Sequence, residues 1–134
     1  MEMGEHAIAS CDDATDFMAQ YPGFGEMRSF TDRLGAEQVA FTWRSMPPGT
    51  GGKGSYGHRH NTQEEIYFVV KGNLLFKLGD EVVEVGPRTA VRVPARVYRS
   101  VHNEGPDEAE LVICSVKGDG GATEPDTTAD FWPE

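Results

Sequence analysis

The sequence has little positive charge, no long apolar run and only two cysteines. Its 134 residues hold 12 Lys and Arg against 22 Asp and Glu, for a net charge of −10. Proteins that bind nucleic acid neutralise phosphates with clustered Lys and Arg, and anionic membrane surfaces attract the same side chains. The charge balance therefore argues against nucleic acid and against a membrane surface as partners.

The missing apolar run argues against a membrane span, which needs ~20 consecutive apolar residues. The first residues, MEMGEHAIASCDD, carry acids where a secretory signal has basic residues followed by an apolar stretch. We therefore expect a cytoplasmic protein, in which Cys11 and Cys114 stay free thiols because the compartment is reducing. Cys114 lies in the apolar run LVICSV and is expected to be a small buried residue.

What the sequence does contain is a series of short β-type segments separated by turns. Between residues 38 and 46 the pattern alternates, with Val39, Phe41 and Trp43 on one face and Thr42 and Arg44 on the other. Further segments of the same kind follow, with Gly, Pro, Asn or Asp between them, at 65–70, 74–78, 81–85, 89–93, 97–102 and 109–116. About eight or nine short strands in one small domain predict an all-β sandwich or barrel.

The two ends of the chain differ from this central region, which we place at about 27–116. The arm at 1–26 allows a short helix from Asp12 or Asp13 through Ala19, or an irregular path along the surface. The tail at 117–134 is rich in Gly, Thr and acids from Lys117 to Asp130, and this part is expected to be loosely ordered. Its two aromatics, Phe131 and Trp132, are expected to dock on the domain or on a partner subunit.

The stretch from Gly52 to Gly72, GKGSYGHRHNTQEEIYFVVKG, carries the candidate site. His58 and His60 are two residues apart, so on an extended chain their imidazoles point the same way. A carboxylate a few residues later completes a set of two histidines and one carboxylate with open coordination positions. The Pro- and Gly-rich loop at 47–54 that precedes it is expected to be a slack connection. The other interpretation of the two histidines is a hydrogen-bonded polar pair at a barrel mouth.

The spacing of this stretch resembles the first motif of the cupin superfamily: Gly, five residues, His-x-His, three or four residues, Glu, six residues, Gly. The residues that match are Gly52, His58, His60, Glu65 and Gly72. A looser second motif matches at Gly86, Pro94 and Asn103. The resemblance covers about residues 36–116. It implies a jelly-roll barrel, also called a double-stranded β-helix, that forms a homodimer and holds one divalent ion, Fe, Mn, Ni or Zn, on His58, His60 and Glu65.

The sequence departs from the family at the usual third histidine, where it has Arg99. Arginine stays protonated and has no lone pair to offer, so it cannot ligate a metal. It could pair with an anionic ligand bound at the metal, or with Glu65 itself, which would remove the metal site. His102 is no substitute, because in a regular strand it points away from the face shared by 99, 101 and 103, and we expect it at the surface or rim.

Two hypotheses for the function follow. The first is a metal-dependent enzyme acting on a small anionic substrate, with Arg99, Tyr67 and Gln63 as substrate-binding residues; dioxygenation, isomerisation and decarboxylation all occur among cupins. Tyr67 is included because it shares a strand face with Glu65. The second is a metal-free module that binds a small anionic ligand without catalysis.

Overall fold

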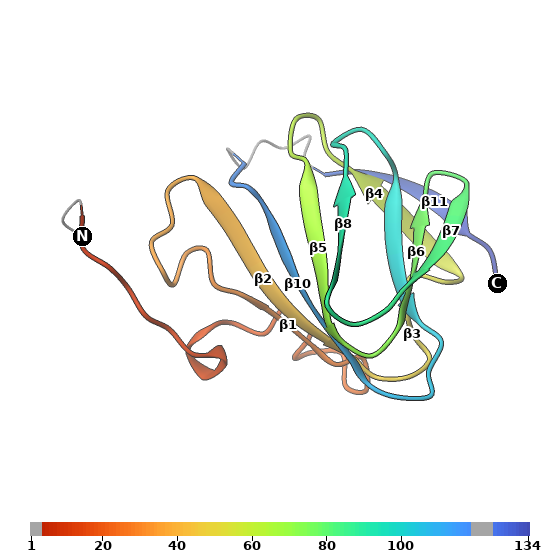
Figure 1. Ribbon diagram of the computed structural model, residues 1–134, viewed down its shortest axis with the longest axis horizontal. Helices are drawn as coiled ribbons and strands as arrows, with labels where there is room; N and C mark the ends of the chain where they lie inside the picture. The colour runs from red at the N-terminus through yellow and green to blue at the C-terminus, as the bar shows by residue number, and fades with distance from the viewer. Residues whose placement is uncertain (1–3, 119–124) are drawn as a thin grey trace.

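The computed structural model describes residues 4–118 and 125–134 as two antiparallel β-sheets that face each other (Figure 1). The first sheet contains, in spatial order, β1 (Glu26–Ser29), β2 (Val39–Met46), β10 (Ala109–Val116), β5 (Glu65–Lys71) and β8 (Thr89–Val93). The second contains β11 (Asp126–Trp132), β4 (Ser55–Arg59), β9 (Arg99–Asn103), β6 (Leu74–Leu78) and β7 (Glu81–Val85), with β3 (Thr50–Gly51) paired to β9. The predicted all-β jelly roll is confirmed.

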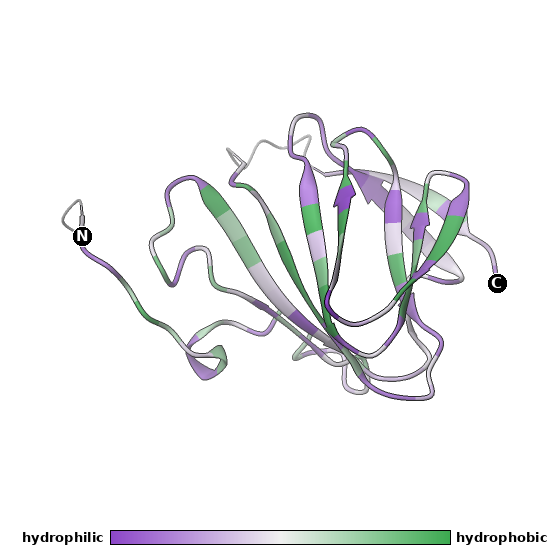
Figure 2. Cartoon of the chain, viewed as in Figure 1, coloured by the Kyte–Doolittle hydropathy of each residue, from purple (hydrophilic) through white to green (hydrophobic). Residues whose placement is uncertain are grey.

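The core lies between the sheets and follows the period-two alternation of the strands. On β5, Tyr67 and Val69 point inward and are buried, as the pattern predicts, whereas Ile66, Phe68 and Val70 point outward. Figure 2 shows the resulting apolar and polar bands along the strands. The remaining buried members of the core cluster are Met46, Leu74, Phe76, Val85, Val93, Val101, Ala109 and Leu111.

The N-terminal arm does not form the helix that its composition allows. Its described residues contain a 3-10 helix, η1 (Cys11–Asp13); the segment before η1 runs out from the sheets, and the segment after η1 returns through turns to β1 (Figure 1). The reason is visible at Asp16, whose carboxylate accepts hydrogen bonds from the backbone N–H of Met18 and of Met27, each at 2.9 Å. An Asp side chain that binds backbone N–H groups in this way competes with helix formation, and here it ties the arm to β1.

The tail is more ordered than its composition predicts. Residues 126–132 form β11, which pairs with β4, and a bulge at Asp130 (φ 55°) interrupts the pairing. The prediction of a loose tail is wrong for this part, while residues 119–124 lie outside the described chain. Trp132 is 5% exposed and stands edge-on to His102, with ring centroids 5.9 Å apart, so the prediction that the tail aromatics dock on the domain is confirmed.

The same contact corrects the prediction for His102. This side chain does point away from Arg99 and Val101, as expected, but it is 8% exposed and not at the surface, because Trp132 covers it. Sequence alternation gave the direction of His102 correctly and could not foresee a covering strand from the tail.

The loop at 47–54 is packed and not slack. Gly51 pairs with His102 across β3 and β9, and its φ of 132° is one that residues with a side chain rarely adopt. A Cβ atom on Gly51 would collide with the carbonyl oxygen of Val101. Close packing against β9 therefore requires glycine here and holds the chain rigidly on its way to His58.

Two smaller expectations have different outcomes. Cys11 and Cys114 are free thiols, as predicted. Cys114 is partly exposed and not buried, because it lies on the outer face of the first sheet. None of the helices in the described residues is long and apolar enough to cross a membrane.

Candidate metal centre

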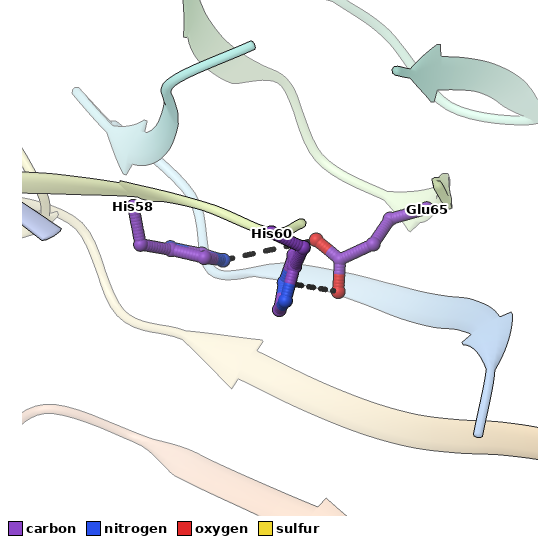
Figure 3. A group of neighbouring side chains, drawn as sticks. All are labelled: His58, His60 and Glu65. Atoms are coloured by element: carbon purple, nitrogen blue, oxygen red, sulfur yellow. Dashed lines mark ion pairs between the residues drawn. The ribbon is translucent and has the colours of Figure 1, made fainter. Parts of the chain in front are cut away.

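The three residues of the predicted metal set come together where the two sheets approach each other. His58 belongs to β4, His60 follows directly after β4, and Glu65 is the first residue of β5 in the opposite sheet. The backbone N–H of His60 donates to the carbonyl of Ala95 at 2.8 Å, which holds the chain in place just beyond the strand. Figure 3 shows the two imidazoles and the carboxylate converging on one region.

The geometry of the three side chains suits a metal ion. Nε2 of His58 lies 3.7 Å from Oε1 of Glu65, and Nε2 of His60 lies 3.5 Å from Oε2. One ligand atom from each residue can be chosen so that all lie within 4.8 Å of one another. Ligands bound at about 2.0–2.2 Å in tetrahedral geometry are separated by little more than 3 Å, so a small contraction brings this set into coordination distance.

Glu65 is held in its ionised form by its surroundings. Burial raises the pKa of its carboxyl, but hydrogen bonding to His58 and Tyr67 and the electrostatic influence of His60 and Arg99 outweigh burial and lower the pKa below its ordinary value. The Tyr67 hydroxyl donates to Oε1 of Glu65 at 2.7 Å. Burial, together with the adjacent Glu65, raises the pKa of Tyr67 well above its usual value, so the phenol remains a donor.

Arg99 is fully buried beside this carboxylate. Its Nε atom lies 3.7 Å from Oε1 of Glu65, and its terminal nitrogens donate to backbone carbonyls, including that of Pro94 at 2.9 Å. The guanidinium lines neither of the two cavities described below. Of the two arrangements considered from sequence, this geometry corresponds to pairing with Glu65. The role of Arg99 in binding a substrate stays a prediction without a contact to support it.

Two adjoining cavities lead to the site from inside the barrel. A cavity of about 350 Å³ is lined by His58, His60, Glu65 and Tyr67, and a second of about 300 Å³ is lined by Arg44, His58 and Tyr67. The residues common to both are Met27, Tyr56, His58, Tyr67 and Ile113. The centre therefore opens onto a space large enough for a small organic molecule.

Gln63 is not brought into either cavity. Its amide nitrogen donates to the carbonyl of Val116 at 2.7 Å, which fixes the chain before β5 and leaves no contact with the metal set. The neighbouring Glu64 faces outward and pairs with Arg92 at 2.8 Å. Glu65 is thus the carboxylate that faces the two histidines, in agreement with the spacing of the motif.

Arg44 is the residue of the cavity that sequence reasoning missed. The alternation of β2 separated Arg44 and Thr42 from Val39, Phe41 and Trp43 without telling which face points inward. In the structure the face of β2 that carries Arg44 points inward. Arg44 pairs with the buried Leu111 of β10 and lines the second cavity. The available signal for an inward-facing cation was a charged residue, Arg44, in a strand that otherwise has only apolar and small polar residues.

Comparison of the sequence and structure with those of known proteins supports the fold described above. A family model described as a cupin domain matches residues 42–115. An uncharacterized protein from Methanocaldococcus jannaschii is 31% identical over 58 residues, which are 43% of this chain and 46% of that protein. The match therefore spans about half of the length of this relative.

Solved structures of similar shape are more distant in sequence. The polyketide cyclase RemF from Streptomyces resistomycificus has a TM-score of 0.71 at 17% identity, with 96% of this chain and 87% of that one covered. A cupin protein from Bacteroides fragilis has a TM-score of 0.69 at 17% identity (89% and 90% covered). A predicted oxalate decarboxylase from Thermotoga maritima has a TM-score of 0.65 at 18% identity (82% and 98% covered). Likeness at this level of identity shows the fold alone.

Proposed function

Because the chain belongs to the cupin family, we propose that it is a metal-dependent enzyme for a small molecule, with one divalent ion held by His58, His60 and Glu65. The observation that carries the proposal is the convergence of two imidazoles and an ionised carboxylate from opposite sheets within 4.8 Å. These are residues of the type and number found in sites that keep open positions for a substrate.

The donor set fits Fe, Mn, Ni or Zn, since imidazole and carboxylate suit each of these ions. When bound, such an ion supplies a Lewis acid or a centre for O₂ chemistry. The protein contributes orientation: the Tyr67 hydroxyl holds Oε1 of Glu65, and the Ala95 carbonyl holds the backbone of His60. Dioxygenation, isomerisation and decarboxylation are the reaction classes that we consider for this site. Among proteins of similar shape are a polyketide cyclase and a predicted oxalate decarboxylase, which supports small-molecule chemistry in general.

The test is the metal content of the full chain, purified without chelator and measured by elemental analysis, followed by titration with Fe²⁺, Mn²⁺, Ni²⁺ and Zn²⁺. We expect about one equivalent of metal per chain, lost in His60→Gln and retained in His102→Gln, whose side chain packs under Trp132 away from the site. A wild-type chain that contains no metal and takes up none contradicts the proposal.

A second candidate function rests on Arg99. Its Nε atom already faces Glu65 at 3.7 Å, so the carboxylate has a positive partner without a metal. In this alternative the barrel is a metal-free module that binds a small anion. The variant Arg99→His distinguishes the metal-dependent enzyme from the metal-free module. Metal affinity in this variant, with none in the wild type, supports the metal-free module. Tight metal binding by the wild type contradicts the metal-free module.

A further inference from the structure

Arg44 is a cation inside the barrel without an anionic partner. Its Nε atom is buried and has no hydrogen-bond partner, and among the described residues no carboxylate pairs with its guanidinium. The cavity that it lines has no Asp or Glu in its wall. Tyr56 and Tyr67 also line this cavity, and both interact electrostatically with the arginine.

This arrangement differs from that of Arg99. The Arg99 guanidinium donates from its terminal nitrogens to the carbonyls of Val93, Pro94 and Ala95. Its Nε atom, like that of Arg44, is buried without a hydrogen-bond partner, but it lies beside Glu65, so Arg99 has the counter-charge that Arg44 lacks. Taking a charged group out of water is unfavourable when no counter-charge or hydrogen bond replaces the water. Burial accordingly lowers the pKa of Arg44. An anion that enters the cavity supplies the counter-charge that Arg44 lacks in the free protein.

We propose that Arg44 is the anion-binding residue of the cavity and that it takes the carboxylate of a small organic acid. The planar guanidinium fork matches a carboxylate with two parallel hydrogen bonds. A single arginine balances one negative charge, and the cavity wall contains no second Lys or Arg for a phosphate dianion. These two points favour a carboxylate over a phosphate.

The position of the cavity orients such a ligand. Tyr56, His58 and Tyr67 line both cavities, so a molecule held at Arg44 extends directly toward His58, His60 and Glu65. We infer that the substrate is a small acid with a second oxygen function directed at these three residues. This last step rests on the proposed metal function, whereas the carboxylate-binding site at Arg44 does not.

The test is calorimetric titration of the full chain with malonate, succinate and inorganic phosphate, once with chelator present and once after addition of one equivalent of Mn²⁺. We expect malonate or succinate to bind the wild type with a Kd below about 10 mM and Arg44→Met to bind at least about tenfold more weakly. Arg44→Lys keeps the charge but not the planar fork, and is expected to lie between them. The matched control is Arg92→Met, which removes an exposed arginine paired with Glu64 and leaves binding unchanged.

Thermal unfolding tests the same point without a ligand. Since Arg44 is an uncompensated charge, Arg44→Met is expected to raise the Tm of the free protein, and succinate is expected to raise the Tm of the wild type only. A purely structural arginine predicts the opposite, a lower Tm in the variant.

The outcomes separate this inference from the proposed function. If carboxylate binding depends on Arg44 but not on Mn²⁺, and the chain takes up no metal, the carboxylate-binding site is supported and the proposed metal enzyme is contradicted. Equal carboxylate affinity in the wild type and Arg44→Met, or no carboxylate binding by the wild type, overturns the proposed binding site at Arg44. This holds even if metal binds at His58, His60 and Glu65. Phosphate binding alone overturns the assignment to a carboxylate.

Discussion

The Nε atom of Arg99 lies 3.7 Å from Oε1 of Glu65, and both side chains are inside the barrel. Arg99 thus places a fixed positive charge beside the carboxylate of the candidate metal centre. That charge, with the electrostatic influence of His60 and hydrogen bonds to His58 and Tyr67, keeps the carboxylate ionised although burial alone would raise its pKa. The pair therefore links the stability of the barrel to the chemistry of the site.

The first prediction concerns this pair. Glu65→Gln is expected to lower the free energy of unfolding by about 3 kcal/mol, because the buried Arg99 loses its counter-charge. The double variant Glu65→Gln/Arg99→Met removes both charges and is expected to recover most of the loss. Urea unfolding with chelator present measures the effect without metal.

The adjacent Glu64 provides the control. It pairs with Arg92 at 2.8 Å on the exposed surface, where an ion pair contributes about 0–1 kcal/mol. Glu64→Gln is therefore expected to have little effect. A loss in Glu65→Gln no larger than that in Glu64→Gln would show that Arg99 does not depend on the carboxylate.

The second prediction concerns Tyr67, whose hydroxyl donates to Oε1 of Glu65 at 2.7 Å. Tyr67→Phe is expected to weaken metal binding about tenfold, because partners of this kind orient a ligand and their removal costs about 10- to 100-fold in affinity. Competition with a chromogenic chelator measures the affinity. Tyr98→Phe removes a similar hydroxyl, which donates to Asp126 outside the site, and is expected to leave the affinity unchanged. Equal losses in both variants contradict the assignment.

The strands and the metal set could be predicted because their signals are local. Alternation and turn residues mark β5 to β8 and β10, and the strand predicted at 109–116 is β10. His58, His60 and Glu65 lie within eight residues of one another. The spacing of the two histidines and the resemblance of the stretch to the first cupin motif were therefore enough to identify them. Period-two alternation also gave the correct inward face of β5.

What could not be predicted depends on contacts between distant segments. The tail strand DTTADFW is polar and has no local signal, and it is held by pairs such as Arg59–Asp126 at 2.8 Å and by Trp132 against His102. The inward direction of Arg44 depends on its register against Leu111 of β10. In both cases the partner lies thirty or more residues away in the sequence, so a local pattern cannot indicate it.

The third prediction concerns the outer face of the first sheet, which we propose as the homodimer interface. Neighbouring strands place exposed apolar side chains there, namely Val39, Phe41, Ile66, Phe68, Val70 and Val116. A second copy is the partner that fits, because charges of both signs flank the patch, in the pairs Glu64–Arg92 and Lys71–Glu110. Two copies related by a two-fold axis can match these charges despite the net charge of −10.

Phe68→Glu is accordingly expected to convert a dimer into a monomer in size-exclusion chromatography with light scattering. Phe68 is 37% exposed at the middle of the patch, where a charge cannot be buried between two copies. Val82→Glu is the control, since Val82 is 47% exposed on β7 of the other sheet. A wild-type monomer, or a dimer that survives Phe68→Glu, contradicts this interface.

The fourth prediction concerns pH and His102, whose ring is buried beneath Trp132. Its Nδ1 atom accepts a hydrogen bond from the backbone N–H of Lys53 at 3.3 Å, which requires that nitrogen to be unprotonated. Burial lowers the pKa of His102 below 6.5; Glu104 and Glu134 oppose the shift, and the charge of Lys53 adds to it. The folded state therefore prefers the neutral ring, while the unfolded chain takes up a proton near pH 6.5.

The sign of the effect follows from this difference in proton uptake. The contribution of His102 to stability is fully present above pH 6.5 and is lost as the pH falls below 6.5 and then through the lower pKa of the folded state. The wild type is expected to lose more free energy of unfolding between about pH 7.5 and about pH 5.5 than His102→Gln does, measured by urea unfolding with tryptophan fluorescence. His6→Gln, a change at an exposed position of the arm, is expected to behave like the wild type. If His102→Gln loses as much as the wild type, the protonation of the buried ring is not linked to folding, and this prediction is wrong.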